Sequence, residues 1–419
     1  ELESPTSETF SIAGYWFRPH ALIGRHLSQT MKCMLLLLMC AGAATGIARV
    51  HDTDTGDRWI PRKRIHGWGA DRHAPVLRVM DSDRASPARD RLEWIQWRAT
   101  LGTHRSYQNT SDEELHARVF EETELMVKEN LIAYEKGKCS YYLGINKFAD
   151  LTQDEYAKFV MSPETAKARR EFFENMNVSN NESADFIPPS RAYPRSVDWR
   201  NIITFTDIKN QGECGSCTAF STISSIEAQI AIHKNVTVDL SEQFIMDCTW
   251  HVQGDFNNGC DGGLETVSFE WLASTNRSVL TQKQYPYQGK LVSCPSKNGI
   301  GNYKVKGYKR TPTNDEEKLA SAVAAFGPIT CGIYASEPDF IYYSGGIYDN
   351  KWCAVKNSQE YYNVDHAVVA IGYGTEGGRE YWILRNSWGK NWGEGGYMRL
   401  ERGVGRCAFP DVTAWPTIY

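Results

Sequence analysis

The sequence has no long hydrophobic run and almost no excess of charge. The apolar run Met34–Cys40 is too short to cross a bilayer. The 46 basic and 51 acidic side chains leave a net charge of only −5, and no basic cluster is interleaved with aromatic residues, as nucleic-acid grooves require. No internal repeat or low-complexity tract is present either. We therefore expect neither stable membrane insertion nor a nucleic-acid partner.

The sequence also lacks paired metal ligands. Cys214-Gly215-Ser216-Cys217 is formally a C-x-x-C motif, but a zinc site would need a second close pair of ligands, and none is suitably spaced. A G-x-G-x-x-G pattern at 372–377 is followed by a strand pattern, so it indicates a hairpin turn rather than a dinucleotide loop. We expect no metal and no organic cofactor. A redox role for the C-x-x-C pair stays open as an alternative.

One cysteine stands at the start of a predicted helix. After Cys217, apolar residues recur every three or four positions, as on one face of a helix, at Phe220, Ile223, Ile226 and Ile230. The free backbone N–H groups and the positive dipole end at such a start favour a thiolate and lower the thiol pKa. Because the thiolate is the nucleophilic form, the sequence predicts that Cys217 is a reactive cysteine.

A nucleophilic cysteine needs a base and a group that orients the base. His366 lies in the β-branched run 364–371, and Asn386 follows a second strand pattern that begins near Tyr381. With the motif around Cys217, this order resembles the papain-like cysteine proteases of the cathepsin group. The resemblance makes Cys217 the nucleophile, His366 the base and Asn386 the orienting amide. Thr218, where that family usually has a bulky aromatic residue, counts against activity.

The resemblance also assigns the surrounding residues. Gln211 would donate its side-chain amide to the oxyanion, and Trp388 would shield the bond between His366 and Asn386 from water. Gly262 and Gly263 would let a substrate backbone approach closely, since no side chain blocks it. The second specificity pocket would consist of Leu264, Glu265, Gly332, Ala367 and Val412. We expect Glu265 to point to solvent, and the alternative is that it admits a basic substrate residue.

The resemblance pairs six of the eleven cysteines into three disulfides. These are Cys214–Cys260, Cys248–Cys294 and Cys353–Cys407, although six cysteines alone allow fifteen pairings. Cys331 is left over, and we expect a buried apolar residue there rather than a second nucleophile. Cys139 has no assigned partner.

The N-terminal part indicates the secretory pathway. Residues 31–48 have one basic residue, a short apolar run and small residues at the end, which is typical of a signal peptide. Five glycosylation sequons, at Asn109, Asn177, Asn181, Asn235 and Asn276, and the many cysteines agree with an oxidising compartment. We interpret residues 1–30 as an upstream extension, residues 49–90 as a low-order segment, and the destination as lysosomal or extracellular.

Residues 91–160 resemble the inhibitory propeptide of cathepsin L-like precursors. A helix pattern at 112–135, which by itself fits any amphipathic helix, precedes Gly144-Ile145-Asn146-Lys147-Phe148-Ala149-Asp150, which matches that family's Gly-X-Asn-X-Phe-X-Asp motif. We expect acid to release the propeptide, because carboxylates such as Asp150, if they are paired in the precursor, would be protonated. Residues 161–192 would form an exposed processing linker, and residues 193–419 the peptidase domain.

These features predict an α+β papain-like fold. A mainly helical half, about residues 196–310, would pack against a half built on an antiparallel barrel. The expected function is a monomeric cysteine endopeptidase that acts on protein or peptide substrates and is inhibited by its own propeptide. The competing interpretation is a non-catalytic binding protein on the same fold.

Overall fold

The computed structural model describes residues 87–102, 105–179, 193–252, 256–296, 303–353 and 364–419, with the backbone alone at 173–179. All of them belong to one compact unit that spans residues 65–419. The expected upstream extension and signal peptide, and residues 49–86 of the low-order segment, lie outside the described residues.

The helices and strands follow one another in a precursor part and a peptidase part. They are η1 (Ala88–Asp90), α2 (Leu92–Thr100), α3 (Thr110–Glu135), β1 (Tyr141–Leu143), α4 (Gln153–Tyr156), η2 (Ala157–Phe159), α5 (Pro163–Ser179), β2 (Val197–Asp198), η3 (Trp199–Asn201), α6 (Cys217–Lys234), α7 (Glu242–Cys248), η4 (Gly259–Asp261), α8 (Glu265–Thr275), β3 (Val305–Lys309), α9 (Glu316–Phe326), β4 (Ile329–Ile333), α10 (Pro338–Ile341), β5 (Tyr343–Tyr348), β6 (His366–Glu376), β7 (Arg379–Arg385), β8 (Tyr397–Glu401), η5 (Arg406–Ala408) and β9 (Thr413–Ile418).

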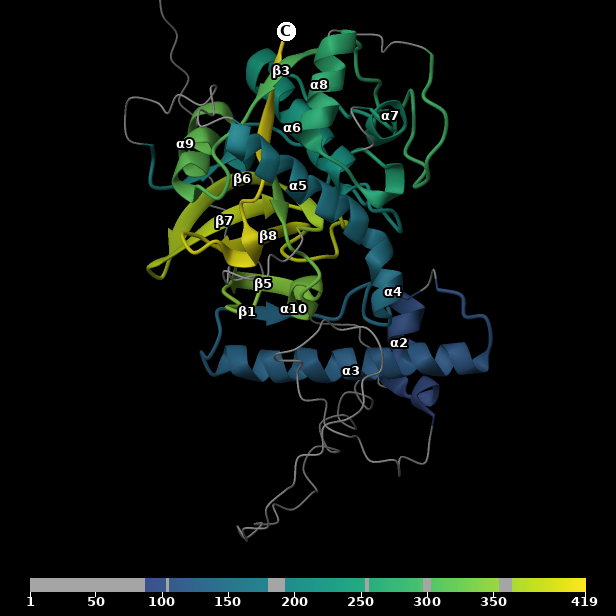
Figure 1. Cartoon of the computed structure of the whole chain (residues 1–419). Coiled ribbons are helices and arrows are strands. Elements are labelled where there is room, and N and C mark those ends of the chain that lie inside the picture. Colours follow the sequence, from purple (N-terminus) through teal and green to yellow (C-terminus); the bar gives the residue numbers. More distant parts are fainter. Residues whose placement is uncertain (1–86, 103–104, 180–192, 253–255, 297–302, 354–363) are drawn as a thin grey trace, which may run out of the picture. The chain divides into compact units, whose positions relative to one another are not determined.

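The strands of the described residues form one sheet in the order β1-β5-β8-β7-β6-β4-β9-β3, and β2 pairs with β6. Neighbouring strands are antiparallel except β5 and β8, which are parallel. β1 comes from the expected propeptide and adds to the edge of the sheet at β5 (Figure 1). The propeptide is therefore tied to the peptidase part by backbone pairing as well as by side chains.

The helical half is built around α6, whose apolar positions are buried in one core with α7 and α8. α7 begins where Ser241 accepts a hydrogen bond from the backbone of Phe244. α9 begins at Glu316, where the Asp315 side chain caps the backbone N–H of Lys318. It ends at Phe326, and Gly327 is its C-cap.

The propeptide folds around a small aromatic core. Trp94 and Trp97 of α2 stack with ring centroids 5.2 Å apart, and both rings contact Phe120 of α3. α3 begins at Thr110, two residues before the expected start, because Asn109 caps the N–H groups of Ser111 and Asp112. In Figure 1 this helix lies beside β1.

The segment expected as an exposed linker, residues 161–192, is partly helical and buried, and from here on the name propeptide includes Met161 and α5. α5 covers residues 163–179, and Thr165, Ala166 and Arg169 on it are buried. The polar composition of the segment concealed this, because a charged residue, Arg169, lies on the buried helix face. Residues 180–192 lie outside the described part.

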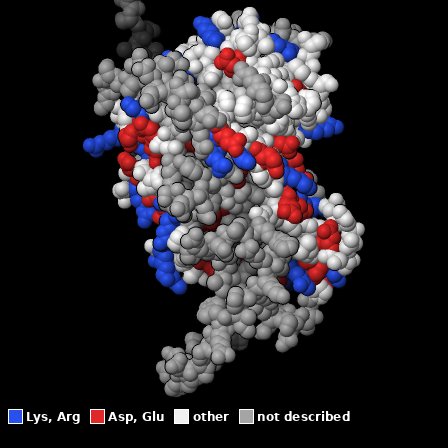
Figure 2. Space-filling model, in the orientation of Figure 1, with Lys and Arg blue, Asp and Glu red and all other residues white. Residues whose placement is uncertain are grey.

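On the face shown in Figure 2, acidic and basic side chains are interspersed. Among the described residues, no helix has the length and apolar character needed to cross a membrane. Within the same residues, no cluster of His, Cys, Asp and Glu has the arrangement of a metal site.

Candidate active site

Cys217 is the first residue of α6, and its side chain is fully buried. The disulfide Cys214–Cys260 anchors the loop before the helix. Gly215 makes this loop possible, because a Cβ there would lie 2.4 Å from the Cys260 carbonyl oxygen. Cys217 shares a buried apolar cluster with Ala367 of β6 and Met161 of the propeptide. The predicted helix start thus lies against the strand that carries His366.

His366 and Asn386 are hydrogen-bonded to each other. The distance from His366 Nε2 to Asn386 Oδ1 is 2.8 Å, and both side chains are buried. His366 opens β6, and Asn386 follows β7, the antiparallel neighbour of β6. The Trp388 ring lies 4.6 Å from the imidazole. The other imidazole nitrogen, Nδ1, makes no hydrogen bond among the described residues, so it is free for an acid–base partner.

Gln211 is held firmly beside these residues. Its Oε1 accepts a hydrogen bond of 2.6 Å from Ser387 Oγ, and its backbone N–H donates to the Ser387 carbonyl. Its Nε2 donates to the carbonyl oxygens of Cys214, at 2.9 Å, and of Phe159 in the propeptide, at 3.0 Å. The amide expected to serve the oxyanion therefore contacts the propeptide in the precursor.

Tyr287 supports the same loop and has no counterpart in the sequence analysis. Its hydroxyl donates to the Gln211 carbonyl oxygen at 2.7 Å and bonds with Ser216 Oγ, also at 2.7 Å. Its ring packs edge-on against Phe220 on the first turn of α6. Tyr287 thus braces both ends of the segment that leads to Cys217. Nothing in the local sequence signals this role, because the contact spans more than seventy residues.

The propeptide passes directly over these residues. The Met161 N–H donates to the Asp365 carbonyl at 2.7 Å, and the Ser162 N–H donates to the Asp261 carbonyl at 2.9 Å. Gly262 lies against this segment, since a Cβ there would come within 2.4 Å of Met161 Cγ. Gly263 differs from expectation, because its missing side chain makes room for Asn257. Gly262 therefore lets the propeptide approach closely, whereas the missing side chain of Gly263 serves the packing of Asn257.

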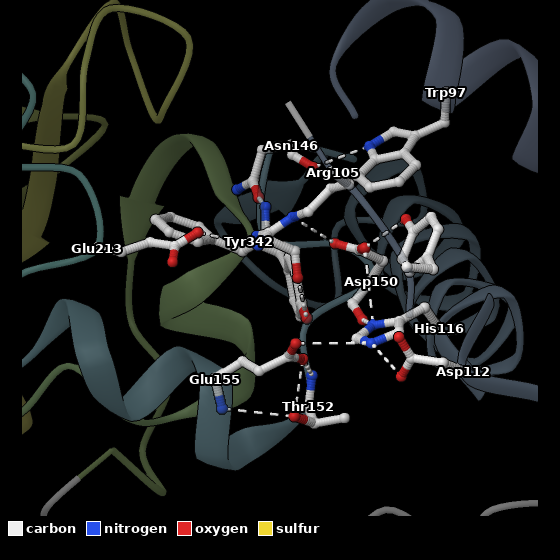
Figure 3. A network of polar contacts seen from close by, with 12 residues as sticks. Trp97, Arg105, Asp112, His116, Asn146, Asp150, Thr152, Glu155, Glu213 and Tyr342 are labelled. Atoms are coloured by element: carbon white, nitrogen blue, oxygen red, sulfur yellow. Dashed lines mark hydrogen bonds and ion pairs between the residues drawn. The ribbon is translucent and has the colours of Figure 1, made fainter. Parts of the chain in front are cut away.

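The Gly-X-Asn-X-Phe-X-Asp motif anchors the propeptide next to the site. Asn146 Nδ2 donates to the Ile341 carbonyl, and the Phe148 ring packs edge-on against Trp388 with centroids 5.2 Å apart. Asp150 is buried and accepts a hydrogen bond of 2.9 Å from the Tyr107 hydroxyl. Figure 3 shows Asp150 beside Arg105 and His116, with Asp112 and Glu155 around the same histidine.

The pocket expected for substrate specificity is occupied. Leu264 is buried with Val267 and Val412, and Phe172 of α5 packs against them. The expectation that Glu265 points to solvent is wrong. Its side chain is only 1% exposed and forms an ion pair of 3.1 Å with Arg169 of the propeptide. Glu265 is the first residue of α8.

Burial keeps both reacting groups neutral in the precursor. It raises the pKa of the Cys217 thiol to about 12, although a hydrogen bond from the Ala367 backbone acts the other way. Burial also lowers the pKa of His366 to about 4, although the hydrogen bond with Asn386 acts the other way. The helix start predicted a thiolate, but here desolvation outweighs the dipole, because the propeptide covers the site. A thiol and a neutral imidazole face the propeptide at neutral pH.

The remaining cysteines have structural positions. The structure contains the disulfides Cys214–Cys260, Cys248–Cys294 and Cys353–Cys407. Cys214 is therefore not paired with Cys217, which removes the basis for a C-x-x-C redox site. Cys331 is fully buried in β4, and burial raises its pKa. The thiol of Cys139 donates to the Tyr141 carbonyl oxygen.

Comparison with known proteins gives the same assignment. Residues 193–417 match the papain family cysteine protease model, and residues 94–156 match the cathepsin propeptide inhibitor domain (I29). The chain is 36% identical to cathepsin L of Sarcophaga peregrina over 78% of this chain and 92% of that protein. It is 38% identical to chymopapain of Carica papaya over 72% of this chain and 79% of that protein.

A solved precursor structure is similar as well. The digestive procathepsin L 3 of the Tenebrio molitor larval midgut superposes with a TM-score of 0.65 and 27% identity. The alignment covers 78% of this chain and 98% of that one. The chain belongs to the papain family of cysteine proteases and is an endopeptidase made as a precursor with an inhibitory cathepsin-type propeptide.

Proposed function

We propose that Cys217 and His366 form the catalytic pair of this endopeptidase. In the released enzyme, Cys217 would transfer its proton to His366 and attack the substrate carbonyl as a thiolate. His366 would then protonate the leaving amine, while Asn386 keeps the imidazole oriented and Trp388 covers their hydrogen bond. The observation that supports these roles best is the 2.8 Å bond between His366 and Asn386 beside the helix that starts at Cys217.

Gln211 is proposed as the oxyanion donor together with the backbone N–H of Cys217. Ser387 fixes the Gln211 amide, and the propeptide carbonyl at Phe159 occupies one of its donor positions. Preorganised donors of this kind contribute about 10²–10³ in rate apiece. Release of the propeptide would free this position for the substrate.

The propeptide is proposed to inhibit by three contacts in the cleft. Met161 covers Cys217, the Phe159 carbonyl occupies Gln211, and Arg169 fills the pocket at Glu265. Cleavage after α5 and upstream of Tyr193 would separate the two parts and remove Met161 and Arg169 with the propeptide. We propose a monomer that enters the secretory pathway and acts in a lysosome or outside the cell, with residues 31–48 as its signal peptide.

Two cysteine variants test the catalytic assignment. Cys217→Ala should abolish hydrolysis of a dipeptidyl fluorogenic amide and retain the fold, because no other thiol lies at the start of α6. Cys331→Ala, which removes a thiol that is equally buried but lies in β4, should keep the activity. Substantial turnover by the Cys217 variant would contradict the mechanism. Normal alkylation of Cys217 with no turnover on any peptide would instead favour a non-catalytic binding protein.

A further inference from the structure

A buried ion pair links the propeptide to the specificity pocket. Arg169, on α5, and Glu265, on α8, are each only 1% exposed. Arg169 Nη1 donates to Glu265 Oε2 at 3.1 Å and to the Gly263 carbonyl oxygen at 3.2 Å. Charged side chains are rarely so deeply buried unless they are paired. The pocket beside the cleft thus holds a cation in the precursor.

The peptidase part is shaped to receive this cation. Ser221 Oγ of α6 lies 3.2 Å from the second carboxylate oxygen of Glu265 and 3.1 Å from the Thr218 carbonyl oxygen, so its single proton can serve either acceptor, and this contact with the carboxylate does not involve the propeptide. Gly332 makes room for the guanidinium, because a Cβ there would lie 2.8 Å from Arg169 Nη2. Asp411 adds a second carboxylate, 3.8 Å from Arg169 Nε. Leu264 and Val412 supply an apolar wall for a side-chain stem.

Removal of the propeptide would leave this acidic pocket without its cation. A carboxylate at such a depth is destabilised when its partner is lost, and a new cation restores the pairing. A guanidinium is favoured over an ammonium, since it is planar, weakly hydrated and able to donate several hydrogen bonds.

We propose that Glu265 makes this enzyme accept a basic residue, arginine above lysine, two positions before the scissile bond. The inference rests on the proposed function, which places this pocket next to Cys217. Arg169 of the propeptide then occupies the position that the substrate's basic side chain takes after activation. Leucine can still enter along the wall formed by Leu264 and Val412, so the pocket is expected to serve both side chains.

Two substrates that differ in one residue test the proposal. They are benzyloxycarbonyl-Arg-Arg and benzyloxycarbonyl-Leu-Arg aminomethylcoumarin amides, with the same residue at the cleaved bond. The enzyme released from the full-length precursor should cleave both. In Glu265→Gln, the ratio of kcat/KM for the arginine over the leucine substrate should fall by about 30-fold or more, because a buried charge partner is lost. Glu270→Gln, exposed on the same helix, should leave the ratio unchanged.

The outcomes separate the proposal from the function on which it rests. An unchanged ratio in Glu265→Gln would overturn the proposal. So would a wild-type enzyme that cleaves only the leucine substrate, a result that needs no variant to fold. Cleavage of neither substrate by the wild-type enzyme would contradict the protease function and remove the proposal with it.

The precursor gives an independent readout of the same pocket. Arg169→Gln should raise the residual activity of the intact precursor at neutral pH, since Glu265 loses the side chain that holds α5 in place. Lys167→Gln, an exposed change on the same helix, is the matched control. Equal residual activity in the two variants would show that Arg169 does not occupy a functional pocket.

Discussion

At the scale of single residues, the site depends on side chains that hold other side chains. His366 is oriented by Asn386, Gln211 by Ser387, and the loop before Cys217 by Tyr287. The candidate nucleophile and base follow from local motifs. Asn386 and Gln211 follow from the family resemblance, whereas Tyr287 and Ser387 were not predicted, because they come from segments far from the groups they contact. Thr218 is buried on the first turn of α6, and nothing in the structure explains its departure from the usual aromatic residue.

Tyr287→Phe tests whether the site depends on the hydrogen bonds of this tyrosine. The variant loses the hydroxyl bonds to the Gln211 carbonyl and to Ser216, and leaves those groups unpaired near the buried loop. We expect a loss of about 1–3 kcal/mol in unfolding free energy and a lower kcat with little change in KM, since the oxyanion position loosens. Denaturant unfolding and steady-state kinetics measure both. Unchanged stability and kinetics would show that the loop does not depend on Tyr287.

At the scale of elements, the sequence predicts the elements with strong caps or strong periodicity. α6 begins at Cys217 and β7 covers the strand pattern before Asn386, as predicted, because their signals are local. α5 was missed, since its buried face is held by an arginine and a carboxylate that stands about a hundred residues later. Pairing of β1 with β5 was not predicted either, because strand partners are chosen by tertiary packing.

The propeptide anchor at Asp150 behaves differently from the expectation that its protonation drives release. Burial raises the pKa of Asp150, although Arg105, Tyr107 and His116 act the other way. The ionised form therefore costs free energy in the folded precursor at neutral pH, and this cost disappears as the pH falls through the raised pKa. Protonation of Asp150 in acid therefore does not destabilise the folded precursor, which argues against Asp150 as the trigger of propeptide release.

Asp150→Asn tests whether protonation of Asp150 triggers release of the propeptide. The variant precursor should remain latent at neutral pH and still activate in acid, at a pH midpoint within about half a unit of the parent, because the removed titration is not destabilising. Activity of incubated precursor against pH gives the midpoint. A variant that is active at pH 7 without acid treatment would restore Asp150 as the trigger.

At the scale of the whole molecule, the folded precursor buries its catalytic pair, and this burial makes its stability depend on pH. Buried His366 has its pKa lowered to about 4 from an ordinary value of 6.5, so the unfolded chain binds the proton more readily. The free energy of unfolding of the precursor therefore decreases as the pH falls below 6.5, and it keeps decreasing until the pH reaches the folded pKa of about 4. This contribution is absent above pH 6.5, where His366 is neutral in both states.

His366→Gln isolates this contribution in a background that cannot digest itself. Both proteins also carry Cys217→Ala. Between pH 7 and pH 4, the free energy of unfolding should fall by about 3 kcal/mol more when His366 is present than in the His366→Gln variant, whose neutral amide does not titrate. Carboxyls with raised pKa values, such as Asp365 at about 6, titrate in both proteins and cancel in the comparison. Equal pH dependence in the two proteins would mean that His366 is not held neutral.

The most direct test of the central assignment is labelling of the thiol before and after propeptide release. A peptidyl epoxide is added at pH 7, and the labelled residue is mapped by mass spectrometry while activity is followed. In the released enzyme, Cys217 should be alkylated in step with loss of activity. In the precursor it should stay unlabelled, because Met161 covers it and a thiol with a pKa of about 12 is only about one part in 10⁵ ionised at this pH. Inactivation with the label on Cys331, or equal labelling of Cys217 in precursor and released enzyme, would contradict the account.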